Sequence, residues 1–278
     1  MTKTVELFSG ERVPALGLGT WKMGVGDPDE AQQLRALQAG IDHGMTLIDT
    51  AEMYGDGRSE QLVAKAITGR RGEIFLVSKV LPRNASRQGT IAACERSLER
   101  LGAEVIDLYL LHWRGSHPLR DTVAGFETLK SAGKIRYWGV SNFDVDGMDE
   151  LAALKSASPC AANQVMYHAA SRGIESDLLP HCIAAEVAIM AYSPLGEGLL
   201  TSHPKLAAIA HKHGVVPAAI ALAFAMRLPG VIAIPKSTHA QRVAENARAA
   251  DLELDADDLA SLDAAFPPPR RTMPLAMT

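Results

Sequence analysis

Cysteine is scarce in this sequence of 278 residues, which contains only Cys94, Cys160 and Cys182. An odd number of scattered cysteines supplies neither a disulfide framework nor the paired spacing of a zinc site. We therefore interpret the three thiols as small buried hydrophobic groups in a protein from a reducing compartment, and we expect no metal site.

Long apolar runs and an excess of positive charge are also lacking. The longest apolar candidate, Val215–Met226, is shorter than the roughly 20 residues that span a bilayer and contains Pro217. The first ten residues lack the apolar run of a signal peptide. The formal net charge is −4, whereas proteins that hold nucleic acid are usually basic. We expect a cytoplasmic protein with neither a membrane nor a nucleic-acid partner.

No linker rich in proline, glycine or serine divides the chain, and no low-complexity tract is present. Hydrophobic residues make up 47% and charged residues 22% of the chain, which is typical of soluble globular proteins. The length is near the upper limit for one hydrophobic core. We predict a single domain over residues 1–278.

Short β-branched apolar runs alternate with longer segments of helical period. The predicted strands are Ala15–Gly19, Thr46–Ile48, Ile74–Ser78, Ile106–Leu111, Tyr137–Val140, Ala162–Val165, Ala188–Ala191 and Val231–Ile234. The predicted helices are Asp29–His43, Glu60–Thr68, Gln88–Leu101, Leu119–Ala132, Met148–Lys155, Glu175–Ala185, Pro217–Arg227 and His239–Arg248. Eight parallel βα units fit a closed (β/α)8 TIM barrel, whose usual length is about 250 residues. An open doubly wound sheet is disfavoured, because Gly17–Lys22 lacks the third glycine of a dinucleotide fingerprint.

Two segments lie outside this repeat. Thr4–Val13, with Ser9–Gly10 in its middle, predicts an N-terminal β-hairpin that plugs the bottom of the barrel. Asp255–Phe266 predicts an extra C-terminal helix, with Asp255 as its N-cap and Pro267–Pro269 after its end.

Polar residues close seven of the eight predicted strands. They are Asp49, Lys79, His112, Ser141–Asn142, Gln164, Tyr192–Ser193 and Lys236–Ser237. In a TIM barrel the carboxyl ends of the strands carry the chemistry. Each of these residues alone is consistent with an ordinary loop or packing role, but the repeated placement predicts one shared polar site.

Four residues near these strand ends suit the reduction of a carbonyl group. Asp49 and Lys79 end neighbouring strands and can form a buried ion pair. The Lys79 ammonium is expected to lower the pKa of the nearby Tyr54 phenol by favouring its phenolate. Tyr54 would then donate a proton to a developing oxyanion, while His112 orients the carbonyl. The set contains no activated nucleophile and no metal cluster, so a cofactor must deliver the hydride.

Seven blocks of the sequence resemble the aldo-keto reductase family over essentially the whole chain. They are Gly44–Tyr54, Ser78–Lys79, Leu111–Trp113, Gly139–Phe143, Asn163–Val165, Ala191–Gly196 and Ile234–Ser237 followed by Arg242 and Asn246. The chain is similar to the short bacterial branch, which includes methylglyoxal-type and diketogluconate-type reductases. The resemblance implies NADPH-dependent reduction of aldehydes and ketones, with Tyr54 as general acid. It also implies that Lys79 lowers the Tyr54 pKa, that Asp49 anchors Lys79 and that His112 orients the carbonyl.

The resemblance further implies an NADP(H) site. Ser141, Asn142 and Gln164 would bind the nicotinamide carboxamide, and Tyr192 would stack under the ring. The remaining cofactor contacts would come from Thr20, Trp21, Ser193, Leu195, Lys236, Ser237, Thr238, Arg242, Glu245 and Asn246. We also predict a cofactor contact from Glu197, which departs from the family pattern.

The segment from Lys236 to Asn246 favours NADP over NAD. Lys236 and Arg242 place two cations beside a helix that begins near His239. Helix N-termini and the arginine fork both suit a phosphate dianion, whereas an unphosphorylated ribose would leave these cations without a partner. The alternative is a capping loop with solvated charges.

Two segments depart from the family pattern. Gly55–Glu60 is longer than the corresponding loop of larger members, so the family does not define the pocket wall there. Glu197 stands where many relatives carry serine. It either closes a strap over the cofactor by pairing with Lys22 or Lys236, or it is an exposed loop glutamate.

The substrate pocket is expected to have an apolar wall made of Trp21, Met53 and Trp113. The loop after His112 is short, and only twelve residues follow Phe266. We therefore predict an open, poorly selective site for small or activated carbonyls such as methylglyoxal, aromatic aldehydes and keto sugars.

Two other functions fit parts of the pattern. A redox sensor or regulatory subunit of the same fold would bind NADP and turn over slowly, but the complete catalytic set favours turnover. A lyase or isomerase barrel would need no nicotinamide, and the Ile234–Asn246 segment disfavours it. Aldo-keto reductases of this size are typically monomers, and we expect a monomer here.

Overall fold

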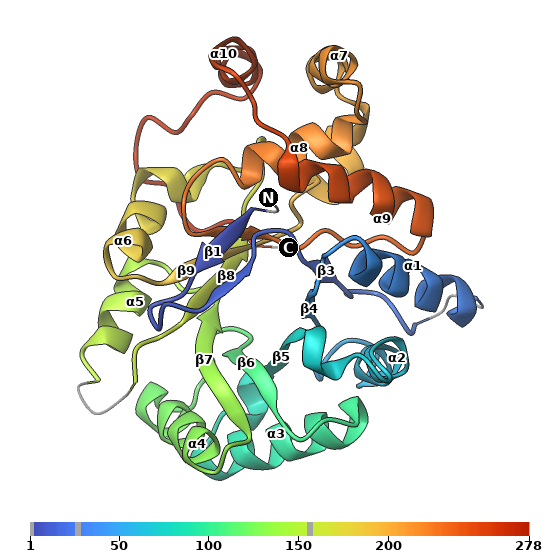
Figure 1. The fold of residues 1–278 in the computed structure, drawn as a ribbon. Helices are drawn as coiled ribbons and strands as arrows, with labels where there is room; N and C mark the ends of the chain where they lie inside the picture. The colour runs from blue at the N-terminus through green and yellow to red at the C-terminus, as the bar shows by residue number, and fades with distance from the viewer. Residues whose placement is uncertain (1–2, 26–28, 155–157, 278) are drawn as a thin grey trace.

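The structure is a computed structural model that describes residues 3–25, 29–154 and 158–277. Within these ranges, eight parallel strands form one sheet with the neighbour order β3 to β10, and helices surround it (Figure 1). The strands are β3 (Leu18–Gly19), β4 (Leu47–Asp49), β5 (Phe75–Val80), β6 (Ile106–Leu111), β7 (Ile135–Ser141), β8 (Ala162–Met166), β9 (Ala188–Tyr192) and β10 (Val231–Ala233). The eight predicted strands all correspond to strands of this sheet.

The described helices lie around the sheet. The α-helices are α1 (Glu30–Asp42), α2 (Arg58–Ala66), α3 (Arg87–Leu101), α4 (Leu119–Ser131), α5 (Val145–Ala152), α6 (Leu178–Ala184), α7 (Pro204–His213), α8 (Pro217–Ala225), α9 (Ala240–Ala247) and α10 (Ala256–Ala265). The short 3-10 turns are η1 (Arg71–Glu73), η2 (Pro82–Asn84), η3 (Gly173–Ser176), η4 (Gly196–Ser202) and η5 (Arg248–Asp251).

The sheet closes into a barrel because the segment before β3 pairs with β10. Leu16 forms a parallel bridge with Ala233. The Ala233 amide donates to the Ala15 carbonyl at 2.8 Å, and the Gly17 amide donates to the Ala233 carbonyl at 2.9 Å. The predicted (β/α)8 fold is confirmed, with residues 15–17 forming the closing seam.

The central strands are buried on both faces. All six residues of β5 and all six of β6 are buried, as expected for parallel strands enclosed by helices. Charged residues in such strands stand out because burying an unpaired charge is costly. Asp49 is the last residue of β4, and Lys79 lies one residue before the end of β5, with exposures of 2% and 0%.

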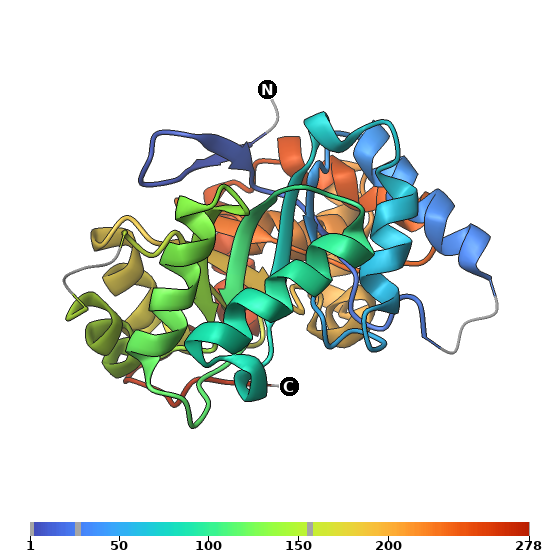
Figure 2. The ribbon, with the colours of Figure 1, turned by 90° about the horizontal axis from the view of Figure 1, so that it is seen from below.

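The predicted hairpin is formed by β1 (Thr4–Glu6) and β2 (Arg12–Pro14). Its turn contacts the first residues of β7: the Ser9 and Tyr137 hydroxyl oxygens are 2.8 Å apart, and Arg136 donates to Glu11 at 2.6 Å. The hairpin therefore covers the amino-terminal end of the barrel. Figure 2 shows it on the opposite side of the molecule from the C-terminal tail.

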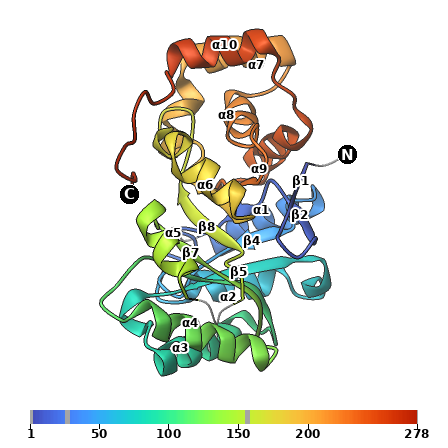
Figure 3. The ribbon, with the colours of Figure 1, turned by 90° about the vertical axis from the view of Figure 1, so that its left-hand side faces the viewer.

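A helix that the sequence analysis missed, α7, packs with the predicted C-terminal helix α10 beside α8 (Figure 3). Its end signals are ordinary: Pro204 opens it, His203 is its N-cap and Gly214 ends it in the left-handed region. In α10, Asp255 is the N-cap as predicted and forms a capping box with Asp258. This layer surrounds a second apolar cluster that includes Leu200, Leu206, Ile209, Ile220, Phe224 and Leu262.

Two predicted helices differ from the structure more than the others do. The segment Glu175–Ala185 is divided into η3 and α6 at Asp177, whose φ of −150° is not helical. The helix predicted at Met148–Lys155 begins three residues earlier, because Asp144 caps it by accepting from the Gly147 amide at 2.9 Å. Its predicted last residue, Lys155, lies outside the described residues.

Within the described ranges, no single helix combines the length and apolar composition needed to cross a membrane. The helices α7 and α8 meet that criterion only as a pair, and they are bent by 94° at the break between them.

Candidate active site

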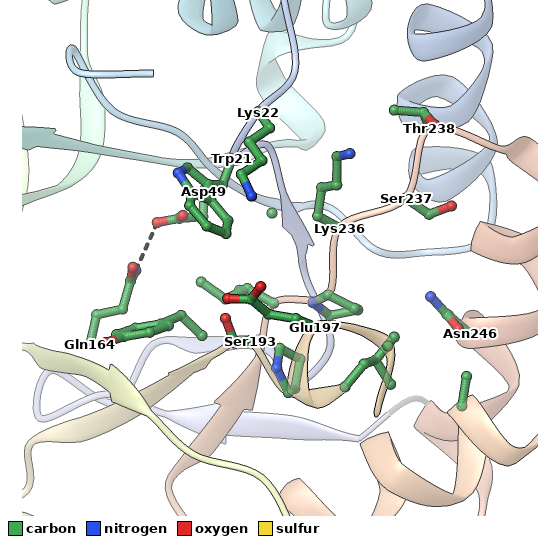
Figure 4. Close-up of a pocket in the computed structure, with 18 of the residues that line it drawn as sticks. Trp21, Lys22, Asp49, Gln164, Ser193, Glu197, Lys236, Ser237, Thr238 and Asn246 are labelled. Carbon is green, nitrogen blue, oxygen red and sulfur yellow. Dashed lines mark hydrogen bonds between the residues drawn. The ribbon is translucent and has the colours of Figure 1, made fainter. Parts of the chain in front are cut away.

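A cavity of about 780 Å³ opens at the carboxyl ends of the strands. The strand-end residues predicted to share one site all line it except Lys79, which lies directly behind Tyr54. Figure 4 shows Asp49 and Gln164 on one side of this cavity and Ser237 and Asn246 on the other. The cavity therefore has two ends, a catalytic end and an end beside α9.

Lys79 is the centre of the catalytic end. Its fully buried ammonium group lies 2.8 Å from the Asp49 carboxylate, 2.9 Å from the Thr50 carbonyl oxygen and 3.2 Å from the Tyr54 hydroxyl. These three acceptors match the three protons of an ammonium group. Gln164 donates to the second oxygen of Asp49 at 2.8 Å, so the buried carboxylate is also fully engaged (Figure 4).

The protonation states follow from burial and from these partners. Burial raises the pKa of the Tyr54 phenol; the Lys79 ammonium lowers it, and the Asp49 carboxylate raises it further. The resulting pKa is above the ordinary value, so the predicted lowering by Lys79 is opposed by a larger effect of desolvation. Burial also lowers the pKa of Lys79, but Asp49 and Tyr54 outweigh it and the pKa is raised. At neutral pH, Tyr54 carries its proton beside a cationic Lys79.

His112 lies beside Tyr54 and is neutral. The two rings are edge to face with centroids 5.7 Å apart. Burial, together with the Lys79 charge, lowers the pKa of His112 to about 2. Its Nδ1 atom is buried and has no hydrogen-bond partner among the residues that the structure describes. Because Nδ1 has no acceptor among them to donate to, the neutral ring loses no hydrogen bond when its proton is on Nε2. His112 can then donate a hydrogen bond from Nε2 without transferring a proton.

Amide and hydroxyl groups continue from this end along the cavity. Asn142 donates to the His112 carbonyl oxygen at 3.2 Å and accepts from the Tyr192 hydroxyl at 3.0 Å. Ser141 donates to the Gln164 carbonyl oxygen at 2.8 Å. Asn142 has a φ of 59°, a left-handed conformation that asparagine tolerates better than most residues. These contacts fix a polar wall able to bind a planar amide.

The loop after β9 forms the middle of the cavity. Ser193, Gly196, Glu197 and Gly198 all have positive φ, between 48° and 96°. Left-handed residues in a short loop turn backbone amides toward a common side and make anion-binding concavities. Ser193, Leu195 and Glu197 line the cavity as predicted, and Figure 4 shows Glu197 between its two ends.

The far end of the cavity is cationic and lies at the start of α9. It is lined by six residues that the sequence analysis assigns to the cofactor site: Lys236, Ser237, Thr238, Arg242, Glu245 and Asn246. Ser237 accepts from the His239 amide at 3.2 Å in the turn that enters α9. A helix N-terminus with adjacent cations favours a phosphate group.

The three residues predicted to form the substrate wall, Trp21, Met53 and Trp113, line the cavity. The sequence analysis missed Met277, which also lines the cavity and brings the C-terminal tail to its mouth. The tail is attached upstream, where Arg172 donates to the Phe266 carbonyl oxygen at 2.7 Å. The site is thus less open than the short tail suggested.

Two predicted cofactor contacts need separate comment. Thr20 is fully buried, and the structure does not place it among the residues that line the cavity. The strap predicted for Glu197 remains a prediction. In this structure the ammonium of Lys22, one suggested partner, lies 4.0 Å from the centroid of the Trp21 ring.

Comparison with known proteins agrees with this geometry. The aldo/keto reductase family pattern matches residues 15–266. The chain is 48% identical over 277 residues to methylglyoxal reductase YeaE of Escherichia coli, covering 97% of each chain, and 36% identical to a glyoxal reductase of Bacillus subtilis, covering 94% and 92%. The crystal structure of an aldo/keto reductase from Klebsiella pneumoniae in complex with NADP and acetate superposes with a TM-score of 0.95 at 46% identity, covering 100% of both chains. The chain belongs to the aldo/keto reductase family.

Proposed function

We propose that this protein reduces small aldehydes and ketones to alcohols with NADPH as the hydride donor. The observation that carries the proposal is the buried contact between Lys79 and the Tyr54 hydroxyl, at one end of a cavity whose other end is cationic. The Escherichia coli relative is a methylglyoxal reductase, and the Klebsiella pneumoniae relative was crystallised with NADP. Both support the same reaction class.

The residues present fit an NADP(H) molecule. The amide wall of Ser141, Asn142 and Gln164 suits the carboxamide, and the left-handed loop after β9 suits the pyrophosphate. Lys236 and Arg242 at the start of α9 suit the 2′-phosphate. When bound, NADPH would supply the hydride that this chain's own residues lack.

The chain's residues supply the proton and the electrostatic support. A carbonyl oxygen at the catalytic end would accept hydrogen bonds from Tyr54 and neutral His112. Tyr54 transfers its proton as negative charge develops on that oxygen. Lys79 stabilises the phenolate left behind, and Asp49 keeps the ammonium in place.

The pocket favours small or activated carbonyls. Trp21 and Met53 are 37% and 36% exposed at the mouth, and Met277 is 55% exposed. An apolar rim around a few polar groups is the usual form of a small-molecule site. The proposed function is tested by following NADPH absorbance with methylglyoxal and with aromatic aldehydes. NADPH consumption that requires both the protein and the carbonyl compound supports the proposed function. If the protein binds NADPH but consumes none of it with any carbonyl in a broad screen, the alternative of an NADP-binding redox sensor is favoured.

Replacing Arg242 by alanine is expected to raise the dissociation constant for NADPH by about tenfold to a hundredfold, because one charge-assisted contact to a phosphate is lost. Arg242 lines the cationic end of the cavity. NADH lacks the 2′-phosphate, so its dissociation constant should change by less than about twofold. Fluorescence titration of both cofactors makes the comparison, and equal losses for NADPH and NADH would contradict this assignment.

The reduction rate is expected to show no titration of His112 from about pH 5 to pH 8. The pKa of His112 is lowered to about 2 by burial and by Lys79, so the imidazole stays neutral throughout this range. A histidine with its ordinary pKa would instead become charged below about pH 6.5. The measurement is kcat/KM against pH, in wild type and in His112→Asn. A limb near pH 6.5 that the variant abolishes would show that His112 does titrate.

A further inference from the structure

Three hydroxyl groups form a buried chain beneath the catalytic residues. Thr20 follows β3, Thr50 follows β4, and Ser59 lies in the first turn of α2. All three residues have no exposed surface. None of these three residues lines the cavity. The chain of hydroxyl groups therefore lies outside the surface that would contact the cofactor and the substrate.

The hydrogen bonds of this chain run in one direction. Thr50 donates to the Ser59 hydroxyl oxygen at 3.2 Å, and Ser59 donates to the Thr20 hydroxyl oxygen at 2.8 Å. Thr20 then donates to the Asp49 carbonyl oxygen at 2.9 Å. The Ser59 hydroxyl also lies 3.2 Å from the Thr20 carbonyl oxygen, so its single proton has two acceptors on the same residue. Consecutive bonds of this kind strengthen one another in a buried site.

The chain joins the backbone segments that position the catalytic groups. The Thr50 carbonyl oxygen is one of the three acceptors of the Lys79 ammonium, at 2.9 Å. The Ser59 amide donates to the Tyr54 carbonyl oxygen at 3.2 Å. One serine therefore connects the backbone that holds Lys79 with the backbone that holds Tyr54. Ser59 also belongs to Gly55–Glu60, the loop whose length departs from larger family members.

We propose that Ser59, with Thr20 and Thr50, is a positioning residue that sets the distance between the Lys79 ammonium and the Tyr54 hydroxyl. Thr20 is also predicted from the sequence as a cofactor contact, although it is not among the residues that line the cavity. The inference rests on the proposed role of Tyr54 as the acid. The titratable groups around the Tyr54 hydroxyl are Asp49, Lys79, His112 and Tyr192. The three hydroxyl residues bond to the Asp49 and Tyr54 carbonyl oxygens and to the Lys79 ammonium.

The experiment compares Ser59→Ala and Thr20→Val with Thr20→Ser, which keeps the hydroxyl. Carbon NMR of protein labelled at tyrosine Cζ, with the Tyr54 signal assigned by Tyr54→Phe, reports the Lys79 contact without NADPH or carbonyl. We expect the signal to move in Ser59→Ala and Thr20→Val and to return toward wild type in Thr20→Ser. In the loaded enzyme, kcat should fall about tenfold with KM nearly unchanged, because small displacements of catalytic groups slow the reaction step.

Thr122→Val is the matched control, because Thr122 is also buried and donates to a backbone carbonyl oxygen, that of Ala85, at 2.6 Å. It should lose similar stability without moving the Tyr54 signal or kcat. Thr20→Val keeps the shape of the side chain. If its Tyr54 signal and its kcat both match those of Thr122→Val, the proposal is overturned. A moved Tyr54 signal in a protein that reduces no carbonyl would preserve the positioning role and reject the proposed function instead.

Discussion

Replacing Tyr54 by phenylalanine is expected to lower kcat for carbonyl reduction by about 10³-fold, the middle of the range for losing a general acid. The substitution removes the hydroxyl that accepts from Lys79 at 3.2 Å, while the ring keeps its buried place beside His112. NADPH affinity should stay within about twofold, because the predicted cofactor contacts are elsewhere. Steady-state kinetics and a fluorescence titration of NADPH measure the two quantities.

The matched control for this prediction is Tyr137→Phe. The Tyr137 hydroxyl donates to Glu11 at 2.7 Å at the opposite end of the barrel. This variant also loses a tyrosine hydroxyl bonded to a charged partner, but it should keep near wild-type kcat. A loss in Tyr54→Phe no larger than in Tyr137→Phe would show that Tyr54 is not the acid.

Replacing Lys79 by methionine is expected to destabilise the fold by about 3–5 kcal/mol, because it leaves the carboxylate of Asp49 buried without its counter-charge. Asp49 is 2% exposed and Lys79 is fully buried. The same variant should lower kcat by about 10²-fold or more, because the phenolate of Tyr54 loses its cation. Chemical denaturation measures the first effect and steady-state kinetics the second.

Two further variants separate these effects. The double variant Asp49→Asn/Lys79→Met removes the unpaired charge, so it should recover part of the stability but none of the activity. Arg114→Met breaks an exposed ion pair with Glu150, whose atoms are 2.8 Å apart, and should change stability by less than about 1 kcal/mol. If Lys79→Met and Arg114→Met have the same free energy of unfolding, the Asp49–Lys79 pair is not a desolvated ion pair.

The catalytic end of the site was predictable because strand ends have few alternatives. Once eight parallel strands were inferred, Asp49, Lys79 and His112 had to meet at the carboxyl edge, and the structure places them there. Tyr54 was predictable because it follows Asp49 by only five residues. The cationic end was also predictable from the sequence, because Lys236 and Arg242 lie on either side of the first residue of a helix.

Other features depend on packing that no local pattern reveals. The position of Met277 depends on contacts of the tail with distant segments, such as Arg172 with the Phe266 carbonyl. The direction of the Tyr54 pKa depends on how completely the phenol is desolvated, which a sequence does not report. The missed helix α7 is different, since Pro204 at its start and Gly214 at its end were readable signals.

The most direct test of the central claim is a single-turnover experiment with the protein in excess over NADPH. Bound NADPH is mixed rapidly with methylglyoxal, aromatic aldehydes and keto sugars in turn, and its absorbance is followed. The account predicts that wild type oxidises the bound NADPH with at least one of these carbonyls and that Tyr54→Phe binds NADPH but leaves it almost unchanged. Bound NADPH that none of these carbonyls oxidises, or equal oxidation by both proteins, would contradict it.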